Sequence, residues 1–254
     1  MSLLEVNGLS KRFGGLHAVK DVSFRVEKGT VKALIGPNGA GKTTLFNLVS
    51  GVLPPDAGTV TLRGAPIHGH PPHRIAALGV SRTFQQIRLF AQMTALENVM
   101  VGVHPRSRAG FVAGMLHLPW TWREERDVEE RAREALDFVG APELAELEAT
   151  SLSYGQQRAV ELARALAADP ELLLLDEPAA GLNMRETAEL AKLIGRVRGA
   201  GVTVLIVEHD MGLVMNVSDE VAVLSYGEKI ADATPRAVQQ NPEVVRVYLG
   251  DEAC

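Results

Sequence analysis

Nine consecutive residues combine glycines with a lysine and two threonines in the pattern G-x-x-x-x-G-K-[ST]. They are Gly36, Pro37, Asn38, Gly39, Ala40, Gly41, Lys42, Thr43 and Thr44. The glycines let backbone N–H groups turn inward around a β-phosphate, and the start of a following helix adds its dipole. Lys42 is expected to reach the β- and γ-phosphates, and the Thr43 hydroxyl is placed for Mg²⁺. The alternative is a glycine-rich turn with an exposed lysine. The setting between an apolar run and a helical pattern favours binding of ATP or GTP.

Two carboxylates, Asp176 and Glu177, directly follow the apolar run Leu172–Leu175. In nucleotide hydrolases of this layout the first acid holds Mg²⁺, usually through water. The next acid can orient or deprotonate the attacking water. Strands often end in solvated acids, so this interpretation depends on the phosphate loop elsewhere in the chain. With that loop present, the pair indicates hydrolysis of the bound nucleotide.

The elements that position these motifs are short apolar runs of the kind found in parallel strands covered on both faces. They are Leu172–Leu175 and Val202–Val207; Val31–Ile35 is expected to be a short buried strand, and Val221–Leu224 another strand. A helix is expected from Thr43 to Ser50, stopped by Gly51. In contrast, Val22, Phe24 and Val26 alternate with polar residues, which predicts a half-buried antiparallel strand.

A helical block separates the strands of this α/β core. Thr94 and Glu97 form a capping-box pattern at its first helix, and residues 123–140 and 159–167 carry apolar stripes at helical spacing. We expect a core of residues 1–86 and 169–240, a helical subdomain of residues 87–168, and a tail of residues 241–254.

The composition limits the class of protein. The 254 residues are 46% hydrophobic and 22% charged, as in globular proteins with a substantial core. A net charge of -5 argues against a surface that neutralises the phosphates of a nucleic acid. The single cysteine excludes a disulfide within one chain. The first residues lack the pattern of a secretion signal, and no apolar run approaches the ~20 residues that span a bilayer. Any membrane role is therefore expected to run through a partner.

A third motif, Leu152-Ser153-Tyr154-Gly155-Gln156-Gln157, precedes a helical pattern. It resembles the L-S-G-G-Q signature that the ATP-binding subunits of ABC transporters carry at this place. The resemblance implies that Ser153, Gly155 and Gln156 contact the γ-phosphate of an ATP presented by the other monomer. Read alone, the motif could equally be a helix cap with Ser153 as the N-cap.

Other positions of the family also occur in order. Phe13 stands where the family stacks an aromatic ring on adenine, although alone it would be read as a core residue. Gln85 occupies the glutamine-loop position that senses the γ-phosphate and Mg²⁺, with Gln86 adjacent. His209 matches the switch histidine at the γ-phosphate. The resemblance thus implies Glu177, His209 and Lys42 as catalytic residues, and Thr43, Gln85 and Asp176 as residues for Mg²⁺.

Two residues depart from the general pattern. Tyr154 replaces the first glycine of the signature pair, and Asn183 replaces the usual aspartate of A-L-D. With both departures the motifs resemble those of one branch of the family, the ATPases of polar amino-acid importers, chiefly importers of branched-chain amino acids. The tail and a long insertion at 104–122 resemble the larger of the two ATPase subunits in that branch.

The resemblance implies an α/β P-loop NTPase (ABC ATPase) core with an antiparallel β subdomain and an inserted helical subdomain. It further implies ATP and Mg²⁺ as ligands, and a second ATP-binding subunit, identical or not, that completes two ATP sites. Two membrane-spanning permease subunits and, indirectly, a solute-binding protein are the implied partners. The chain would then lie peripherally on the cytoplasmic face of the inner membrane.

Three alternatives remain open at this point. An ABC ATPase of the same branch could power the transport of another cargo, in urea import or lipopolysaccharide export. A soluble ABC ATPase of translation or repair is disfavoured, because those carry two cassettes or a long coiled coil. A module that binds ATP without hydrolysing it is disfavoured by Lys42, Asp176, Glu177 and His209.

The insertion carries its own pair of interpretations. Its apolar residues either pin a loop against the helical block or contact the membrane subunit or lipid headgroups. They are Phe111, Met115, Leu116, Leu118, Trp120 and Trp122.

Overall fold

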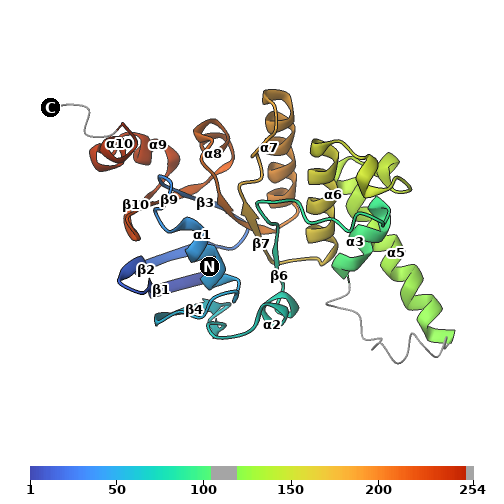
Figure 1. The fold of residues 1–254 in the computed structure, drawn as a ribbon, viewed down its shortest axis with the longest axis horizontal. Coiled ribbons are helices and arrows are strands. Elements are labelled where there is room, and N and C mark those ends of the chain that lie inside the picture. Colours follow the sequence, from blue (N-terminus) through green and yellow to red (C-terminus); the bar gives the residue numbers. More distant parts are fainter. Residues whose placement is uncertain (104–118, 250–254) are drawn as a thin grey trace. The chain divides into compact units, whose positions relative to one another are not determined.

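A computed structural model describes residues 1–103 and 119–249 (Figure 1). The chain divides into two compact units. Unit 1 comprises residues 1–75 and 171–254, and unit 2 comprises residues 76–170. The structure thus divides the chain at residue 76 rather than near 87. The tail from 241 belongs to unit 1, and its residues 242–249 form a helix.

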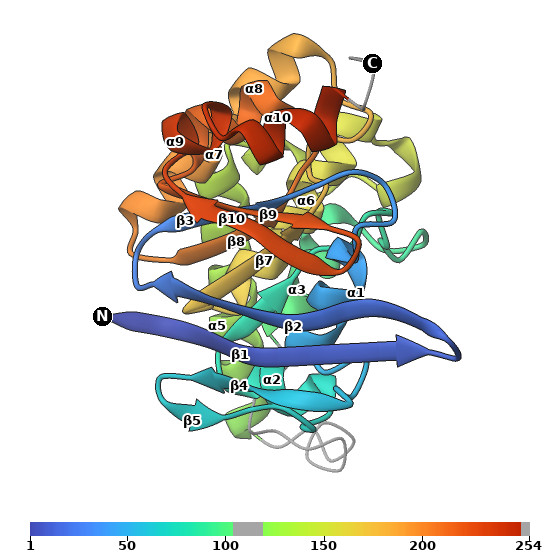
Figure 2. The same cartoon turned by 90° about the vertical axis from the view of Figure 1, so that its left-hand side faces the viewer.

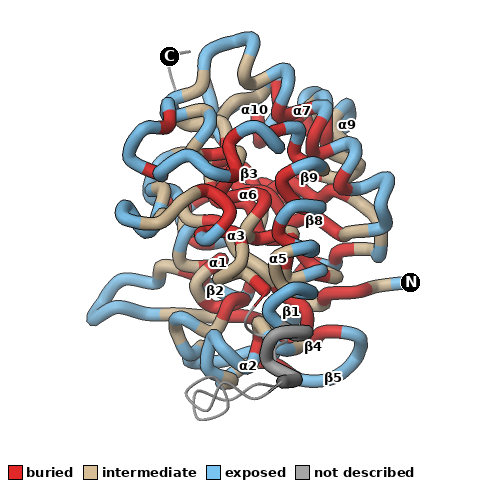
Figure 3. Tube along the Cα trace, turned by 90° about the vertical axis from the view of Figure 1, so that its right-hand side faces the viewer, coloured by how far each residue is buried: buried red, intermediate tan, exposed pale blue. Residues whose placement is uncertain are grey.

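Unit 1 contains two sheets. Five strands of the core sheet run in the order β10-β9-β3-β8-β7, with β3, β7, β8 and β9 parallel and β10 antiparallel at the edge. Their bounds are Val31–Ile35 (β3), Leu172–Asp176 (β7), Thr203–Val207 (β8), Glu220–Ser225 (β9) and Glu228–Ala233 (β10). Every residue of β3, β7 and β8 is buried, which confirms the predicted burial of these strands. Figure 3 shows buried stretches of the trace at β3 and β8 in red.

The second sheet is antiparallel, in the order β2-β1-β4-β5, and it is visible beside the core strands in Figure 2. Its strands are Ser2–Phe13 (β1), Leu16–Glu27 (β2), Ala57–Leu62 (β4) and Ala65–Pro66 (β5). Val22, Phe24 and Val26 are buried while Ser23 and Arg25 are exposed, so the predicted half-buried strand is confirmed. Helix α1 (Lys42–Val49) contacts both β2 and β7 and therefore lies between the two sheets.

Further helices complete unit 1. They are α7 (Met184–Gly199), α8 (Met211–Val217), α9 (Pro235–Gln239) and α10 (Pro242–Leu249). Asn183 caps α7: its side chain accepts from the N–H groups of Arg185 and Glu186, both at 3.0 Å. The Glu186 carboxylate returns a bond to the Asn183 N–H at 2.8 Å. Asparagine therefore keeps the full capping box at the position where the family pattern has aspartate.

Unit 2 is built on three helices that pack together, α3 (Ala95–Val103), α5 (Pro119–Val139) and α6 (Tyr154–Ala167). Short elements connect or precede them: β6 (Val80–Arg82), η2 (Pro142–Leu144) and η3 (Ala149–Ser151), while α2 (Pro72–Ala77) leads in from unit 1. The predicted capping box is confirmed, because the Thr94 hydroxyl accepts from Glu97 N at 3.1 Å and the Glu97 carboxylate from Thr94 N at 2.8 Å.

The insertion at 104–122 lies largely outside the described residues. This holds for Phe111, Met115, Leu116 and Leu118, and for the side chains of Trp120 and Trp122. Within residues 1–103 and 119–249, no helix has the length and apolar character needed to cross a membrane.

Helices α3 and α6 approach so closely that one position requires glycine. A Cβ at Gly102 would lie 2.1 Å from the carbonyl oxygen of Arg164. We expect Gly102→Ala to force the helices apart and to lower the free energy of unfolding by about 1–3 kcal/mol. Chemical denaturation of the purified chain measures this change.

The matched control is Gly195→Ala in α7, where a Cβ would meet open space. That substitution should stabilise the chain by up to about 1 kcal/mol, because alanine has the higher helix propensity. Equal unfolding energies for the two variants would contradict the close packing of α3 on α6.

Candidate functional site

The glycine-rich segment forms a tight loop between β3 and α1, and its glycines are sterically required at two places. A Cβ at Gly36 would lie 2.2 Å from the Leu224 carbonyl oxygen, and a Cβ at Gly41 would lie 2.2 Å from that of Ala18. Both residues also have positive φ angles, 151° and 101°. The surrounding backbone therefore excludes any side chain, and the loop stays narrow enough to cradle a phosphate.

Lys42 lies inside this loop. Its Nζ donates to the carbonyl oxygens of Gly36 at 2.7 Å and Pro37 at 3.0 Å, and the residue is 7% exposed. Burial lowers the pKa of Lys42 below its ordinary value, while the charges of Glu177 and Asp176 act to raise it. The Lys42 ammonium is thus held by backbone carbonyls inside a glycine-rich loop. An anionic ligand bound there would offset the cost of burying its charge.

The predicted acid pair stands at the end of β7. Asp176 is 3% exposed, and Glu177 adopts the left-handed conformation with φ 48°. Such an angle is uncommon for a residue with a side chain and recurs at functional positions. The Glu177 N–H donates to the carbonyl oxygen of Val207 at 2.9 Å, which ties the end of β7 to the end of β8. The backbone at Glu177 is thus held in place.

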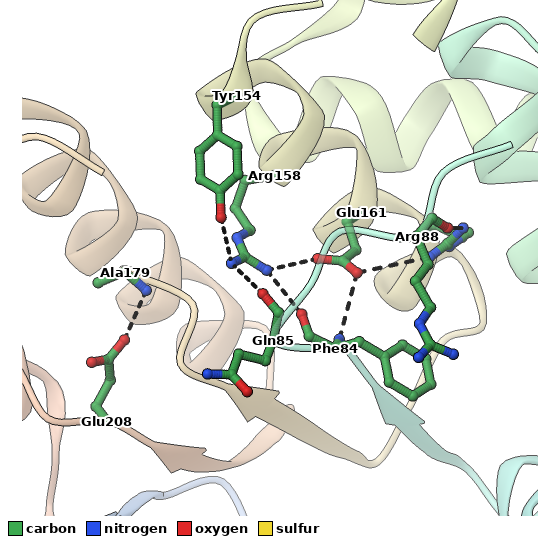
Figure 4. A network of polar contacts seen from close by, with 9 residues as sticks. Phe84, Gln85, Arg88, Tyr154, Arg158, Glu161, Ala179 and Glu208 are labelled. Atoms are coloured by element: carbon green, nitrogen blue, oxygen red, sulfur yellow. Dashed lines mark hydrogen bonds and ion pairs between the residues drawn. The ribbon is translucent and has the colours of Figure 1, made fainter. Parts of the chain in front are cut away.

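Glu208 is a residue whose role the sequence analysis missed. Its carboxylate is fully buried and accepts from the N–H groups of Ala179 at 2.7 Å (Figure 4), His209 at 3.0 Å and Asp210 at 3.3 Å. It therefore joins the segment after β7 to the segment after β8. The only signal in the sequence was a carboxylate that directly extends an apolar strand.

His209, by contrast, projects from this framework. Its side chain is 62% exposed, with Nδ1 at 3.9 Å from the Glu208 carboxylate. The adjoining Asp210 caps α8 by accepting from Leu213 N at 3.0 Å. The backbone on both sides of His209 is held, so an exposed imidazole is presented from a fixed position.

Tyr248 on α10 is a second residue that the sequence analysis did not assign to the site. It receives a backbone hydrogen bond from Gly36, the first residue of the phosphate loop. Tyr248 is 38% exposed, and the partial burial of its ring raises its pKa to about 12. The C-terminal helix therefore supports the loop, although the sequence suggested a separate tail.

Unit 1 thus brings together most of the predicted site. The phosphate loop, the two acids and His209 follow the carboxyl ends of β3, β7 and β8, which are neighbours in the sheet. Phe13 ends β1, is 49% exposed and has the ammonium of Lys11 5.9 Å from its ring centroid. Thr43 is exposed in the first turn of α1.

The remaining predicted residues belong to unit 2. Ser153 is the N-cap of α6: its hydroxyl accepts from Gln156 N at 3.4 Å, and the Gln156 side chain accepts from Ser153 N at 2.9 Å. The cap interpretation of this motif is therefore correct, and it places Ser153 and Gln156, both exposed, at a helix N-terminus, where anions bind readily. Gln85 is also exposed, while its carbonyl is bound by Arg158.

Comparisons with known proteins agree with these motifs. Residues 19–180 match the family described as ABC transporter, and residues 228–254 match one described as branched-chain amino acid ATP-binding cassette transporter. The chain is 48% identical to the high-affinity branched-chain amino acid transport ATP-binding protein BraF of Pseudomonas aeruginosa. It is 46% identical to the corresponding protein LivG of Escherichia coli. Each alignment covers 98% of both chains.

Solved structures give the same result. A crystal structure of the ADP conformation of an ATP-binding cassette of an ABC transporter is 33% identical to the chain, with a TM-score of 0.86. The match covers 98% of this chain and 99% of the other.

The role of Glu208 can be tested by a change of one atom. Glu208→Gln replaces a carboxylate oxygen by an NH₂ group, so at least one of the three N–H donors loses its acceptor. We expect the free energy of unfolding to fall by about 1–3 kcal/mol, the cost of leaving such a group unsatisfied. Urea denaturation measures it. Glu189→Gln, on the exposed face of α7, is the control, and an equally small change in both would refute the role of Glu208 as a link.

Proposed function

Since this chain belongs to the ABC transporter family, we propose that it is the ATP-hydrolysing subunit that powers import of branched-chain amino acids through separate membrane subunits. The observation that carries the cargo assignment is the match of residues 228–254 to the branched-chain amino-acid group, in addition to the ABC transporter match. That segment includes Tyr248, which supports the phosphate loop. The segment that matches the branched-chain amino-acid group therefore contacts the phosphate loop through Tyr248.

The residues of unit 1 supply the hydrolytic chemistry. The loop at residues 36–41 and Lys42 bind the β- and γ-phosphates, and Phe13 stacks on the adenine. Glu177 acts as the general base that takes a proton from the attacking water, and His209 contacts the γ-phosphate. The fixed backbone of Glu177 supports this role, because a general base must be held within hydrogen-bond reach of its water.

Mg²⁺ fits the oxygen donors at this site. The Thr43 hydroxyl is exposed at the end of the loop, and the Asp176 carboxylate stands at the end of β7. Hydroxyl and carboxylate oxygens, with water, are the ligands that Mg²⁺ prefers. We propose Thr43, Asp176 and Gln85 as the residues that hold it. When bound, the ion would neutralise charge on the phosphates.

The number of ATP-binding motifs in the chain indicates that it needs a partner. The chain carries one signature motif and one phosphate loop, so a second ATP-binding subunit, the same or a paralogue, is needed to sandwich two ATPs. Ser153, Gly155 and Gln156 of one subunit then contact the ATP held by the other. Two permease subunits, with a solute-binding protein acting on them, complete the importer, and the chain lies on the cytoplasmic face of the inner membrane.

The general base is tested by Glu177→Gln. The amide cannot accept the proton of the attacking water, so we expect turnover to fall by about 10²–10⁴-fold while ATP still binds. The variant should then accumulate as an ATP-bound dimer, detectable by size-exclusion chromatography with light scattering. Glu189→Gln serves as the matched surface control. Turnover near the wild-type rate in Glu177→Gln would exclude this residue as the base.

The cargo assignment is tested by isolating the assembly from native membranes in gentle detergent. We expect mass spectrometry to identify two hydrophobic permease chains, a second ATP-binding subunit and a periplasmic amino-acid-binding protein. A permease set for urea or lipopolysaccharide would keep the transport function and change the cargo. Recovery of ribosomal or DNA-repair proteins without a membrane chain would overturn transport altogether.

A further inference from the structure

Helix α6 holds the backbone of residues 84–88 through two arginines, and Figure 4 shows the contacts of the first, Arg158. Arg158 donates to the carbonyl oxygens of Phe84 at 3.0 Å and Gln85 at 3.1 Å. One turn and a half further along, Arg164 donates to the carbonyl oxygen of Arg88 at 2.6 Å. These contacts cross more than seventy residues of sequence. The segment that carries Gln85 is therefore anchored to the same helix that begins with the signature motif.

A buried carboxylate organises the two arginines. Glu161 is 1% exposed, and its oxygens lie 3.0 Å from Arg158 Nη1 and 3.9 Å from Arg164 Nη2. Its Oε1 also accepts from Phe84 N at 3.5 Å. Burial raises the pKa of Glu161, and the charge of Arg158 opposes that shift. Because a buried charge is costly without partners, this arrangement restricts the guanidinium of Arg158 to a narrow range of positions.

Tyr154 supplies the fourth hydrogen bond to the terminal nitrogens of that guanidinium, whose Nε is buried without a hydrogen-bond partner among the described residues. Arg158 Nη1 donates to the Phe84 carbonyl and to the Glu161 carboxylate. Nη2 donates to the Gln85 carbonyl and, at 3.2 Å, to the phenol oxygen of Tyr154. Each terminal nitrogen has two N–H groups, so all four are used. The guanidinium carbon also lies 5.7 Å from the centre of the tyrosine ring. A glycine at 154, as in the general signature, would offer neither the oxygen nor the ring.

We infer that Tyr154 is a positioning residue for ATP hydrolysis: its phenol fixes Arg158, which sets the backbone of Gln85 relative to the first turn of α6. That turn also carries Ser153 and Gln156, the residues proposed to contact the ATP of the other subunit. A displacement of Gln85 is thereby transmitted to the signature motif through Arg158, the side chain of α6 that binds the Gln85 carbonyl. The functional part of this inference rests on the role proposed above for Gln85.

The first test is hydrogen–deuterium exchange of the full chain followed by mass spectrometry. Tyr154→Phe removes a single oxygen and keeps the ring. Loss of one hydrogen bond from a buried guanidinium should speed amide exchange in residues 84–88 by about 2–10-fold. The control is Tyr226→Phe, a phenol that is 91% exposed, and it should leave exchange there unchanged. Wild-type exchange in Tyr154→Phe would overturn the inference.

A double-mutant cycle shows whether Tyr154 acts through Arg158. Arg158→Lys keeps the charge but cannot serve both carbonyls as a planar fork, so it should speed exchange in residues 84–88 by itself. Adding Tyr154→Phe to that variant should then change exchange by less than about twofold, because residues in one network are not additive. Fully additive effects would show that Tyr154 acts by another route, contrary to the inference.

Kinetics separate positioning from a loss of binding. In Tyr154→Phe, kcat for Mg-ATP should fall about 3–10-fold while KM changes less than about twofold, since the loop at 36–41 and Lys42 are untouched. Tyr226→Phe should keep both constants. A rise in KM with unchanged kcat would overturn the positioning role.

Gln85→Ala distinguishes failure of this inference from failure of the proposed function. If Gln85→Ala hydrolyses Mg-ATP at the wild-type rate, the role of Gln85 is wrong and the kinetic part of the inference falls with it. Faster exchange in Tyr154→Phe would in that case still support the contact through Arg158. If Gln85→Ala loses hydrolysis while Tyr154→Phe keeps wild-type exchange and kcat, the proposed function stands and the inference alone is overturned.

Discussion

The pairing of β8 between β3 and β7 is the constraint on which the ATP site depends. Parallel pairing places the carboxyl ends of the three strands at one edge of the sheet, so the phosphate loop, the acid pair and His209 emerge side by side. The bond from Glu177 N to the Val207 carbonyl continues that pairing past the end of β7. Without this register, the phosphate loop would have no common geometry with the acid pair and His209, which follow it more than a hundred residues later in the chain.

In each unit a buried carboxylate holds the backbone of a segment that carries proposed ligand-binding residues. Glu208 gathers three backbone N–H groups around the segments that follow β7 and β8, and Glu161 gathers two arginines and a backbone N–H around residues 84–88. A buried charge is tolerated only when its hydrogen bonds are satisfied, and it then allows few alternative geometries. Neither carboxylate needs to touch substrate, yet both determine where proposed ligand-binding residues lie.

The two departures from the general ABC pattern have different consequences. Asn183 acts locally, because its capping box involves residues two and three positions later, and such a pattern is readable from sequence spacing. Tyr154 contacts Arg158 four residues later, which sequence spacing allows. Its link to Gln85, however, depends on which backbone carbonyls accept hydrogen bonds from Arg158. These carbonyls lie more than seventy residues away in the chain, so no local pattern predicts them.

The sequence by itself determined the strands and helices of the core, the phosphate loop with Lys42, the acid pair and the family. These features depend on local patterns: apolar runs, helical periodicity, and glycines at fixed offsets from a lysine. Only the tertiary structure decided the division at residue 76, the support of the loop by Tyr248, and the roles of Glu208 and Glu161. Each of these depends on contacts between residues far apart in the chain, where burial and hydrogen-bond partners are set by packing rather than by neighbours in sequence.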